Sequence, residues 1–222
     1  MPSLSSTLLS TACLIGIVLA APTAPLLHGS PRSSCTAPGN ITMPVTYNLY
    51  PGDPDRAEAP TSYIDIQNLP DREEREQVIV FQGVPAGALT CTLGWVQAAA
   101  AEREFVVEDN GSTKVKPFYD FPSATTRGLE EGDGDCNEEE QDPVINYSTI
   151  KPLSSASAEL ELGPDFTFWN DSPGAVPHVA GAVPCAEEMY FHIRINPGNG
   201  LGDVHFRQDE KNGFIMNWVC EA

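Results

Sequence analysis

Proline and glycine divide this sequence into short pieces. The 222 residues include 20 prolines and 18 glycines, and their spread leaves little room for long helices. Between them lie short runs of β-branched and aromatic residues, which favour strands. Roughly eight to ten strands without long helical intervals predict an all-β fold, an antiparallel β-sandwich.

The expected strands alternate between apolar and polar residues, as strands with one buried face do. Leu89, Cys91, Leu93 and Trp95 share one face, so we expect Cys91 to point into the core. The other expected strands are Tyr63–Ile66, Gln77–Phe81, Phe105–Val107, Thr113–Lys116, Phe166–Trp169, Met189–Ile195, Val204–Arg207 and Phe214–Cys220.

Turn residues predict how some of these strands pair. Asn110-Gly111 is a strong hairpin signal, so we expect the strands on either side of it to pair with each other. Short turns at residues 196–200 and at Asn212-Gly213 predict an antiparallel meander of the last three strands. His192 and His205 would then share an outward polar face. Neighbouring imidazoles can bind a metal, but no third ligand follows at a defined spacing, so we expect surface histidines and no metal site.

One short helix and one acidic insertion interrupt the strands. Val96–Glu104 contains four consecutive alanines and is expected to form at most two helical turns. From about residue 121 to residue 160 acidic residues crowd a segment with few apolar ones, which predicts an exposed loop. Asp133–Glu138 offers carboxylates at alternate positions, loosely like a calcium loop, but Val144 stands where that loop has its glutamate. We prefer a solvated charge run, with weak calcium binding as the alternative.

The N-terminus resembles a secretory signal peptide. Leu14–Ala21 is apolar and ends in small residues, and it is shorter than the about 20 residues that a membrane-spanning helix needs. We therefore expect a signal peptide over residues 1–20, a flexible Pro/Ser-rich arm over 21–40 and a single domain over 41–222. The expected product is a soluble protein, secreted to the extracellular space or the cell wall.

Five cysteines follow the expected signal peptide, and an oxidising compartment favours disulfides between them. An odd number leaves one thiol free or bonded to another chain, and these residues alone leave the pairing open. Four sequons, at Asn40, Asn110, Asn146 and Asn170, predict N-glycosylation and surface positions, with Asn170 the weakest because Pro173 follows its sequon.

Charge and motifs restrict the possible functions. The formal net charge of −19 repels phosphate backbones, so we expect neither nucleic acid partners nor membrane insertion. The sequence contains no motif of a serine, aspartic or zinc hydrolase, so we expect no catalytic residue and no cofactor. Paired carboxylates of a glycoside hydrolase are spaced in three dimensions, which keeps a carbohydrate-active protein as an alternative. Trp169 is its candidate sugar platform, whereas Trp95 and Trp218 lie in the core phase of their strands.

Two stretches of the sequence resemble a known family. Phe81–Leu93, and the segment from Pro184-Cys185 to Cys220, are similar to the fungal secreted domain family named after the C-terminal domain of a ubiquitin 3 binding protein. The resemblance implies a β-rich extracellular domain without established catalysis. It also implies a Cys185–Cys220 disulfide, with Cys91–Cys136 as the second pair.

The expected function is therefore that of a secreted, non-enzymatic fungal protein, associated with the cell wall or acting as an effector-like binding module. Its partner would be a cell-wall polysaccharide, or a host or cell-surface protein. A carbohydrate-active hydrolase or carbohydrate-binding protein and a weak calcium-binding protein are the alternatives.

Overall fold

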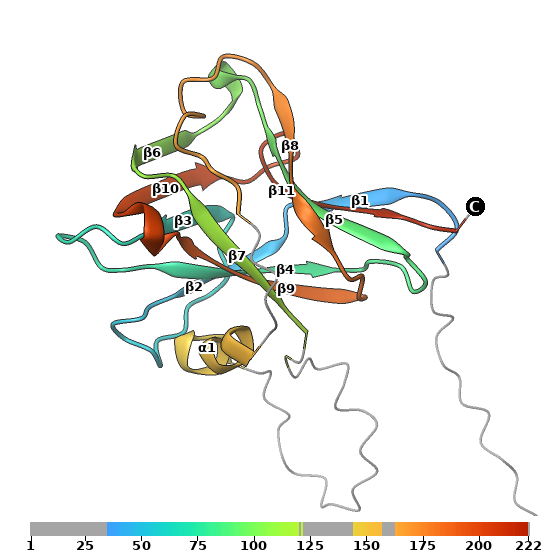
Figure 1. Ribbon diagram of the computed structural model, residues 1–222, viewed down its shortest axis with the longest axis horizontal. Helices are drawn as coiled ribbons and strands as arrows, with labels where there is room; N and C mark the ends of the chain where they lie inside the picture. The colour runs from blue at the N-terminus through green and yellow to red at the C-terminus, as the bar shows by residue number, and fades with distance from the viewer. Residues whose placement is uncertain (1–34, 120, 122–143, 157–162, 222) are drawn as a thin grey trace, which may run out of the picture. The chain divides into compact units, whose positions relative to one another are not determined.

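Antiparallel strands are the main secondary structure of the computed structural model, which describes residues 35–119, 121, 144–156 and 163–221. Internal contacts divide the chain into residues 1–31 and 32–222, and every described residue lies in the second unit. Within this unit the strands form three sheets that pack around shared apolar side chains, so the predicted antiparallel, sandwich-like fold is confirmed (Figure 1).

Each sheet combines strands from distant parts of the sequence. One has the order β2-β4-β9-β7, formed by Val45–Leu49, Glu76–Gln82, Glu188–Ile195 and Thr113–Phe118. Another has the order β1-β11-β5-β8, formed by Gly39–Thr42, Gly213–Val219, Thr90–Gln97 and Val176–Val183. The third has the order β3-β10-β6, formed by Tyr63–Gln67, Gly202–Arg207 and Phe105–Asp109. The helical elements are η1, α1 and η3, at Ala100–Glu102, Tyr147–Ala156 and Pro197–Asn199.

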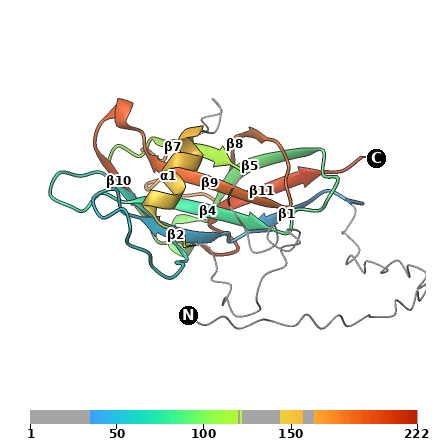
Figure 2. The same ribbon diagram turned by 90° about the horizontal axis from the view of Figure 1, so that it is seen from below.

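The sheet β2-β4-β9-β7 is buried on both faces. On one face, side chains such as Ile79 and Phe191 join the main core with residues of the other two sheets. On the opposite face, Val78 and Tyr190 pack with Ile150 of α1. Figure 2 shows α1 lying across this sheet, where it contacts β7 and β9. Burial on both faces explains why β4 and β9 contain nearly continuous buried runs rather than strict alternation.

Several predicted pairings are wrong because each strand finds its partner far away in the sequence. The last three strands form no meander, since β9 pairs with β4 and β7, β10 with β3 and β6, and β11 with β1 and β5. No hairpin forms at Asn110-Gly111, because β6 pairs with β10 while β7 pairs with β9. A Cβ on Gly111 would lie 2.5 Å from the Thr167 nitrogen. The close approach of two backbones therefore requires glycine here.

Local predictions also need correction. Val96–Glu104 forms no α-helix, since β5 extends to Gln97 and only η1 follows. The expected strand Phe166–Trp169 is a turn. The helix α1 lies instead inside the expected acidic loop, and β1 begins at Gly39, slightly before the expected domain boundary.

The disulfides differ from the pairing that the family resemblance implied. Cys35 bonds to Cys220, with their Cα atoms 5.4 Å apart, and Cys91 bonds to Cys185, with their Cα atoms 5.2 Å apart. The implied Cys185–Cys220 and Cys91–Cys136 pairs are therefore wrong, and Cys136 lies outside the described residues. Antiparallel pairing of β1 with β11 brings Cys35 close to Cys220. The strand β1 was not predicted from the sequence, so this disulfide could not be predicted either. Cys91 is fully buried, as its place in the alternating pattern predicted.

Candidate functional site

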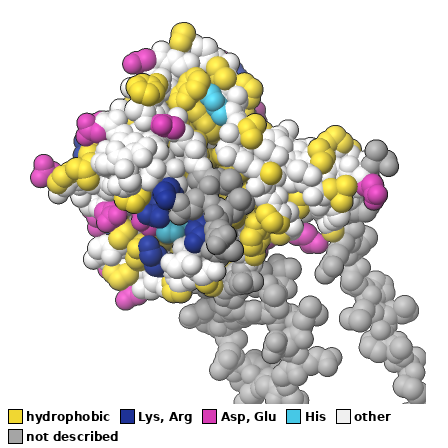
Figure 3. Space-filling model, in the orientation of Figure 1, with side chains coloured by type: hydrophobic (Ala, Val, Ile, Leu, Met, Phe, Trp, Pro, Cys, Tyr) yellow, Lys and Arg dark blue, Asp and Glu magenta, His cyan; other side chains and the backbone are white. Residues whose placement is uncertain are grey.

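A small basic pocket lies between α1 and the strands β7 and β9. It has a volume of about 60 Å³ and is lined by Lys114, Lys116, Lys151, Ser154, Ser155, His192 and Arg194. On the face shown in Figure 3, Lys and Arg side chains gather around a histidine. The lining contains three of the four lysines of a chain whose formal net charge is −19. Such a local excess of cations sets this pocket apart from the composition of the whole chain.

The register of β7 against β9 brings basic residues of the two strands opposite each other. Lys114 lies opposite Arg194, and Lys116 lies opposite His192. Because side chains alternate along a strand, all four residues lie on the same face, while Val115 between the lysines points into the main core. Like charges directly opposite each other on two strands destabilise a sheet.

The helix α1 completes the pocket from above the sheet. Asn146 caps its first turn, since Asn146 Oδ1 accepts from the Thr149 amide at 2.9 Å and Thr149 Oγ1 accepts from the Asn146 amide at 3.1 Å. Ile150 and Ser154 are four residues apart and therefore face the same side. Ile150 enters the apolar cluster, and Ser154 reaches the sheet near His192. The same orientation places Lys151 and Ser155 at the pocket.

A buried polar chain forms the floor of the pocket. His192 Nδ1 lies 2.9 Å from Ser154 Oγ, and His192 Nε2 lies 2.6 Å from Glu76 Oε2. All three residues are buried: Ser154 is 2% exposed, His192 is 4% exposed and Glu76 is 6% exposed. A carboxylate only accepts, so Nε2 donates to Glu76. When the ring carries no second proton, Nδ1 accepts from the Ser154 hydroxyl, whose other acceptor is the Lys151 carbonyl at 3.3 Å.

Charged neighbours act on both acidic and basic groups around the pocket. Burial raises the pKa of Glu74, the Glu76 carboxylate adds to this rise, and Lys151 and Arg194 oppose it. Within the described part of the chain, no carboxylate forms an ion pair with Lys116 or Lys151. The pocket therefore favours an anion as its ligand.

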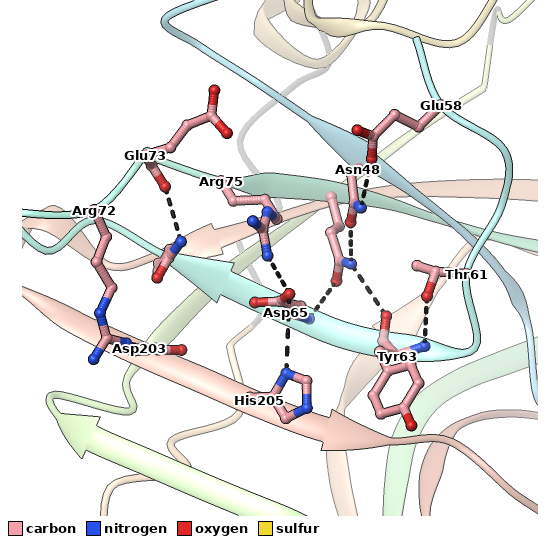
Figure 4. A network of polar contacts seen from close by, with 12 residues as sticks. Asn48, Glu58, Thr61, Tyr63, Asp65, Arg72, Glu73, Arg75, Asp203 and His205 are labelled. Carbon is pink, nitrogen blue, oxygen red and sulfur yellow. Dashed lines mark hydrogen bonds and ion pairs between the residues drawn. The ribbon is translucent and has the colours of Figure 1, made fainter. Parts of the chain in front are cut away.

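A second polar network lies on the sheet β3-β10-β6 and its surroundings (Figure 4). Asp65 forms an ion pair with Arg75, and His205 Nδ1 lies 3.9 Å from the Asp65 carboxylate. The Gln77 side chain accepts from the Asp65 amide at 3.0 Å and donates to Asn48 Oδ1 at 2.8 Å. Most of its polar groups pair with one another, while Arg75 Nε and Asp203 Oδ1 are buried without a partner, and we assign this network a structural role.

The two histidines on strands do not lie together as expected. His192 is buried under α1 rather than exposed on a polar face, because the helix covers that side of β9. His205 lies in a different sheet and stacks on Tyr63, with ring centroids 5.1 Å apart. Among the residues that the structure describes, no group of three or more His, Cys, Asp or Glu side chains could hold a metal ion. The possible calcium loop at Asp133–Glu138 lies outside those residues.

Trp169, the candidate sugar platform, and its neighbours Phe166 and Phe168 do not form one flat surface. Phe166 is fully buried, whereas Phe168 is 85% exposed. Trp169 is partly buried and packs edge-on against Trp95, with ring centroids 5.9 Å apart. Trp95 is buried, as its place in the alternating pattern predicted, and Trp218 is partly buried against the main core.

The four sequons occupy different environments. Asn40 is exposed and Asn170 is partly buried. Asn146 is 7% exposed, and its Nδ2 donates to the Asp55 carbonyl at 3.3 Å. The Nδ2 atom of Asn110 is buried without a partner. Asn146 therefore has no surface position, and at Asn110 the nitrogen that would carry a glycan faces no solvent.

Comparison with known proteins assigns the chain to no family, since no family model and no curated protein matches it. No helix within the described ranges is long and apolar enough to cross a membrane.

Sequence reasoning missed the pocket although its parts were visible. Thr113–Lys116 and Met189–Ile195 were both predicted as strands, and His192 was expected on a polar face. The pairing of these two strands could not be predicted, because they lie far apart in the sequence. A concentration of three of four lysines on one strand pair and one helix is the signal that could have found the site.

Proposed function

We propose that the protein is a secreted extracellular module that binds an anionic group in its basic pocket. Three features support secretion: the signal-like N-terminus, the two disulfides and the sequons. The family resemblance supports a fungal origin. The function rests on one observation above all, the cross-strand placement of Lys114 opposite Arg194 and of Lys116 opposite His192.

The size of the pocket limits the ligand to a small group. A cavity needs about 10–15 Å³ on this measure to hold one water molecule, so about 60 Å³ admits a carboxylate, sulfate or phosphate but not a sugar ring. The ring or chain that carries the anion would lie outside. An acidic substituent on a cell-wall polysaccharide is the source that agrees with the proposed location.

Isothermal titration calorimetry at low ionic strength tests this function, since salt screens such interactions. Wild-type protein is titrated with sulfate, phosphate and acetate, and then with an acidic polysaccharide, a neutral polysaccharide and an acidic peptide. We expect heat from the oxyanions and from the acidic polysaccharide, and none from the neutral one. Heat from the acidic peptide alone would assign the site to protein partners instead.

Matched variants locate the binding site. Lys116→Gln and Lys151→Gln each remove one charge from the pocket, whereas Lys211→Gln removes the fourth lysine, which pairs with Glu102 elsewhere. Hydrogen bonds to charged groups contribute about 1.5–3 kcal/mol, so each pocket variant should weaken binding about tenfold or more. Equal losses in all three variants would show that net charge, not the pocket, drives binding.

A further inference from the structure

The floor of the pocket holds groups that binding an anion does not require. Ser154 and His192 both line the pocket although they are 2% and 4% exposed. Both residues therefore border the pocket with the small part of their surface that stays accessible. A simple anion site needs cations and donors, whereas this one also places a hydroxyl against an imidazole whose other nitrogen meets a carboxylate.

The hydrogen-bonded series of Ser154, His192 and Glu76 has the geometry of an activated nucleophile. Ser154 Oγ lies 2.9 Å from His192 Nδ1, and His192 Nε2 lies 2.6 Å from Glu76 Oε2. A base within hydrogen-bond reach of a hydroxyl, itself oriented by a third group, is the arrangement that makes serine nucleophilic. The Ser154 hydroxyl and the Glu76 carboxylate contact different nitrogens of the His192 ring. The imidazole can therefore take the hydroxyl proton at Nδ1, and the carboxylate at Nε2 stabilises the imidazolium that results.

The three groups come from three separate elements and are held firmly. Glu76 begins β4, His192 lies in the paired strand β9, and Ser154 lies in α1 above them. Helix packing by Ile150 fixes the height of Ser154 over the sheet. The Ser154 hydroxyl also lies 3.3 Å from the Lys151 carbonyl, a longer contact than the one to His192.

The surrounding cations suit the chemistry of acyl transfer. Lys116 lies opposite His192, and Lys151 lies three residues before Ser154 on the same helix. Positive groups placed near a reacting carbonyl stabilise the oxyanion that develops there. They also attract a substrate that carries its own negative charge.

We propose that Ser154 is a catalytic nucleophile with which the pocket hydrolyses esters whose acyl part carries an anionic group. Ser154 Oγ forms a bond to the acyl carbon while its proton moves to His192 Nδ1. The ester C–O bond then breaks, and the leaving alkoxide takes that proton and departs as the alcohol. Water next attacks the acyl-serine and gives one proton to His192, which returns it to Ser154 as the acid leaves. One ester and one water yield one acid and one alcohol.

This inference goes beyond the proposed binding function and rests on the same pocket. It would replace the expected non-enzymatic role with the hydrolase alternative. Binding and chemistry are measured separately, so either can fail without the other.

The experiment treats the folded protein with a fluorophosphonate, which loses fluoride as it bonds to an activated serine. Peptide mass spectrometry should locate one adduct per chain, on Ser154. Ser154→Ala should give none, whereas Ser62→Ala, which changes an exposed serine outside the pocket, should label like the wild type. Heat-unfolded wild type serves as the second control and should not label, which separates reactivity from mere exposure.

Hydrolysis of 4-nitrophenyl succinate, a monoanionic ester, gives the second readout. His192→Gln should lower the rate by about 10²–10⁴-fold, the usual contribution of a general base. An adduct at Ser154 without sulfate binding would uphold this inference and overturn the binding function. Sulfate binding without an adduct on folded wild type, or hydrolysis unchanged in Ser154→Ala, would overturn this inference and leave the binding function in place.

Discussion

His192 and Glu76 form a buried contact between neighbouring strands, with Nε2 2.6 Å from Oε2 and side chains only 4% and 8% exposed. Removing the carboxylate would leave a buried donor unsatisfied, which costs about 1–3 kcal/mol. We therefore expect Glu76→Ala to lower the free energy of unfolding by that amount. Glu76→Gln retains an acceptor and should cost less. Urea denaturation measures both, and equal losses would contradict a stabilising role of the hydrogen bond.

The two disulfides should each contribute strongly to stability. Cys35 and Cys220 are 185 residues apart in the sequence, and Cys91 and Cys185 are 94 apart. Removing a native disulfide from a small secreted domain costs about 2–5 kcal/mol. Replacing either pair with alanine should therefore lower the free energy of unfolding by an amount in this range. A non-reducing peptide map should yield Cys35–Cys220 and Cys91–Cys185 peptides, whereas a linked Cys185–Cys220 peptide would contradict the fold described here.

Glycosylation should be selective among the sequons. We expect a glycan at Asn40, which is exposed, and none at Asn146, whose side chain caps α1 and is 7% exposed. In protein secreted by a eukaryotic host, Asn40→Gln should remove the glycan mass and Asn146→Gln should leave it unchanged. Mass spectrometry of the intact wild type and of both variants measures whether the glycan mass is lost. A glycan on Asn146 of folded protein would contradict the position of α1.

Acid should weaken the contacts of Glu58. Hydrogen bonds from Tyr50, then from Asn48 and Arg56, lower the pKa of Glu58 to about 2. The unfolded value is about 4.3, so these contacts stabilise the fold above that pH and lose their effect as the pH falls toward 2. Because Glu58 is partly exposed, the effect on stability should stay below about 1 kcal/mol.

A nuclear magnetic resonance titration of the Glu58 carboxyl measures this shift directly. Tyr50→Phe removes the largest cause and should raise the pKa of Glu58 toward its ordinary value. A wild-type Glu58 that already titrates near its unfolded pKa would contradict the observed contacts.

The sequence predicted several strands well because short runs of β-branched and aromatic residues between turn residues are a local signal. Tyr63–Ile66, Gln77–Phe81 and Met189–Ile195 all lie in observed strands. Pairing was not predictable in the same way, since the neighbours of each strand lie far away in the sequence. Gly111 illustrates the error: its turn-like dipeptide suggested a hairpin, whereas the glycine serves the close approach of the Thr167 backbone.

The candidate site depended on the same missing information. His192 was expected on a polar surface because its neighbours Tyr190 and Arg194 share its face. The helix α1 covers this face of β9. Because α1 lies in a segment that the sequence predicted to be an exposed acidic loop, its position was not predictable. A histidine buried between a serine and a glutamate from distant elements leaves no spacing in the sequence to detect.

A crystal of the protein soaked in selenate, whose selenium scatters anomalously, tests the pocket most directly. The structure predicts an anomalous peak between α1, β7 and β9, with selenate oxygens about 2.7–3.2 Å from the Nζ atom of Lys116 or Lys151. A pocket open to solvent in the crystal that stays without a peak, while selenate binds elsewhere, would contradict anion binding at this site.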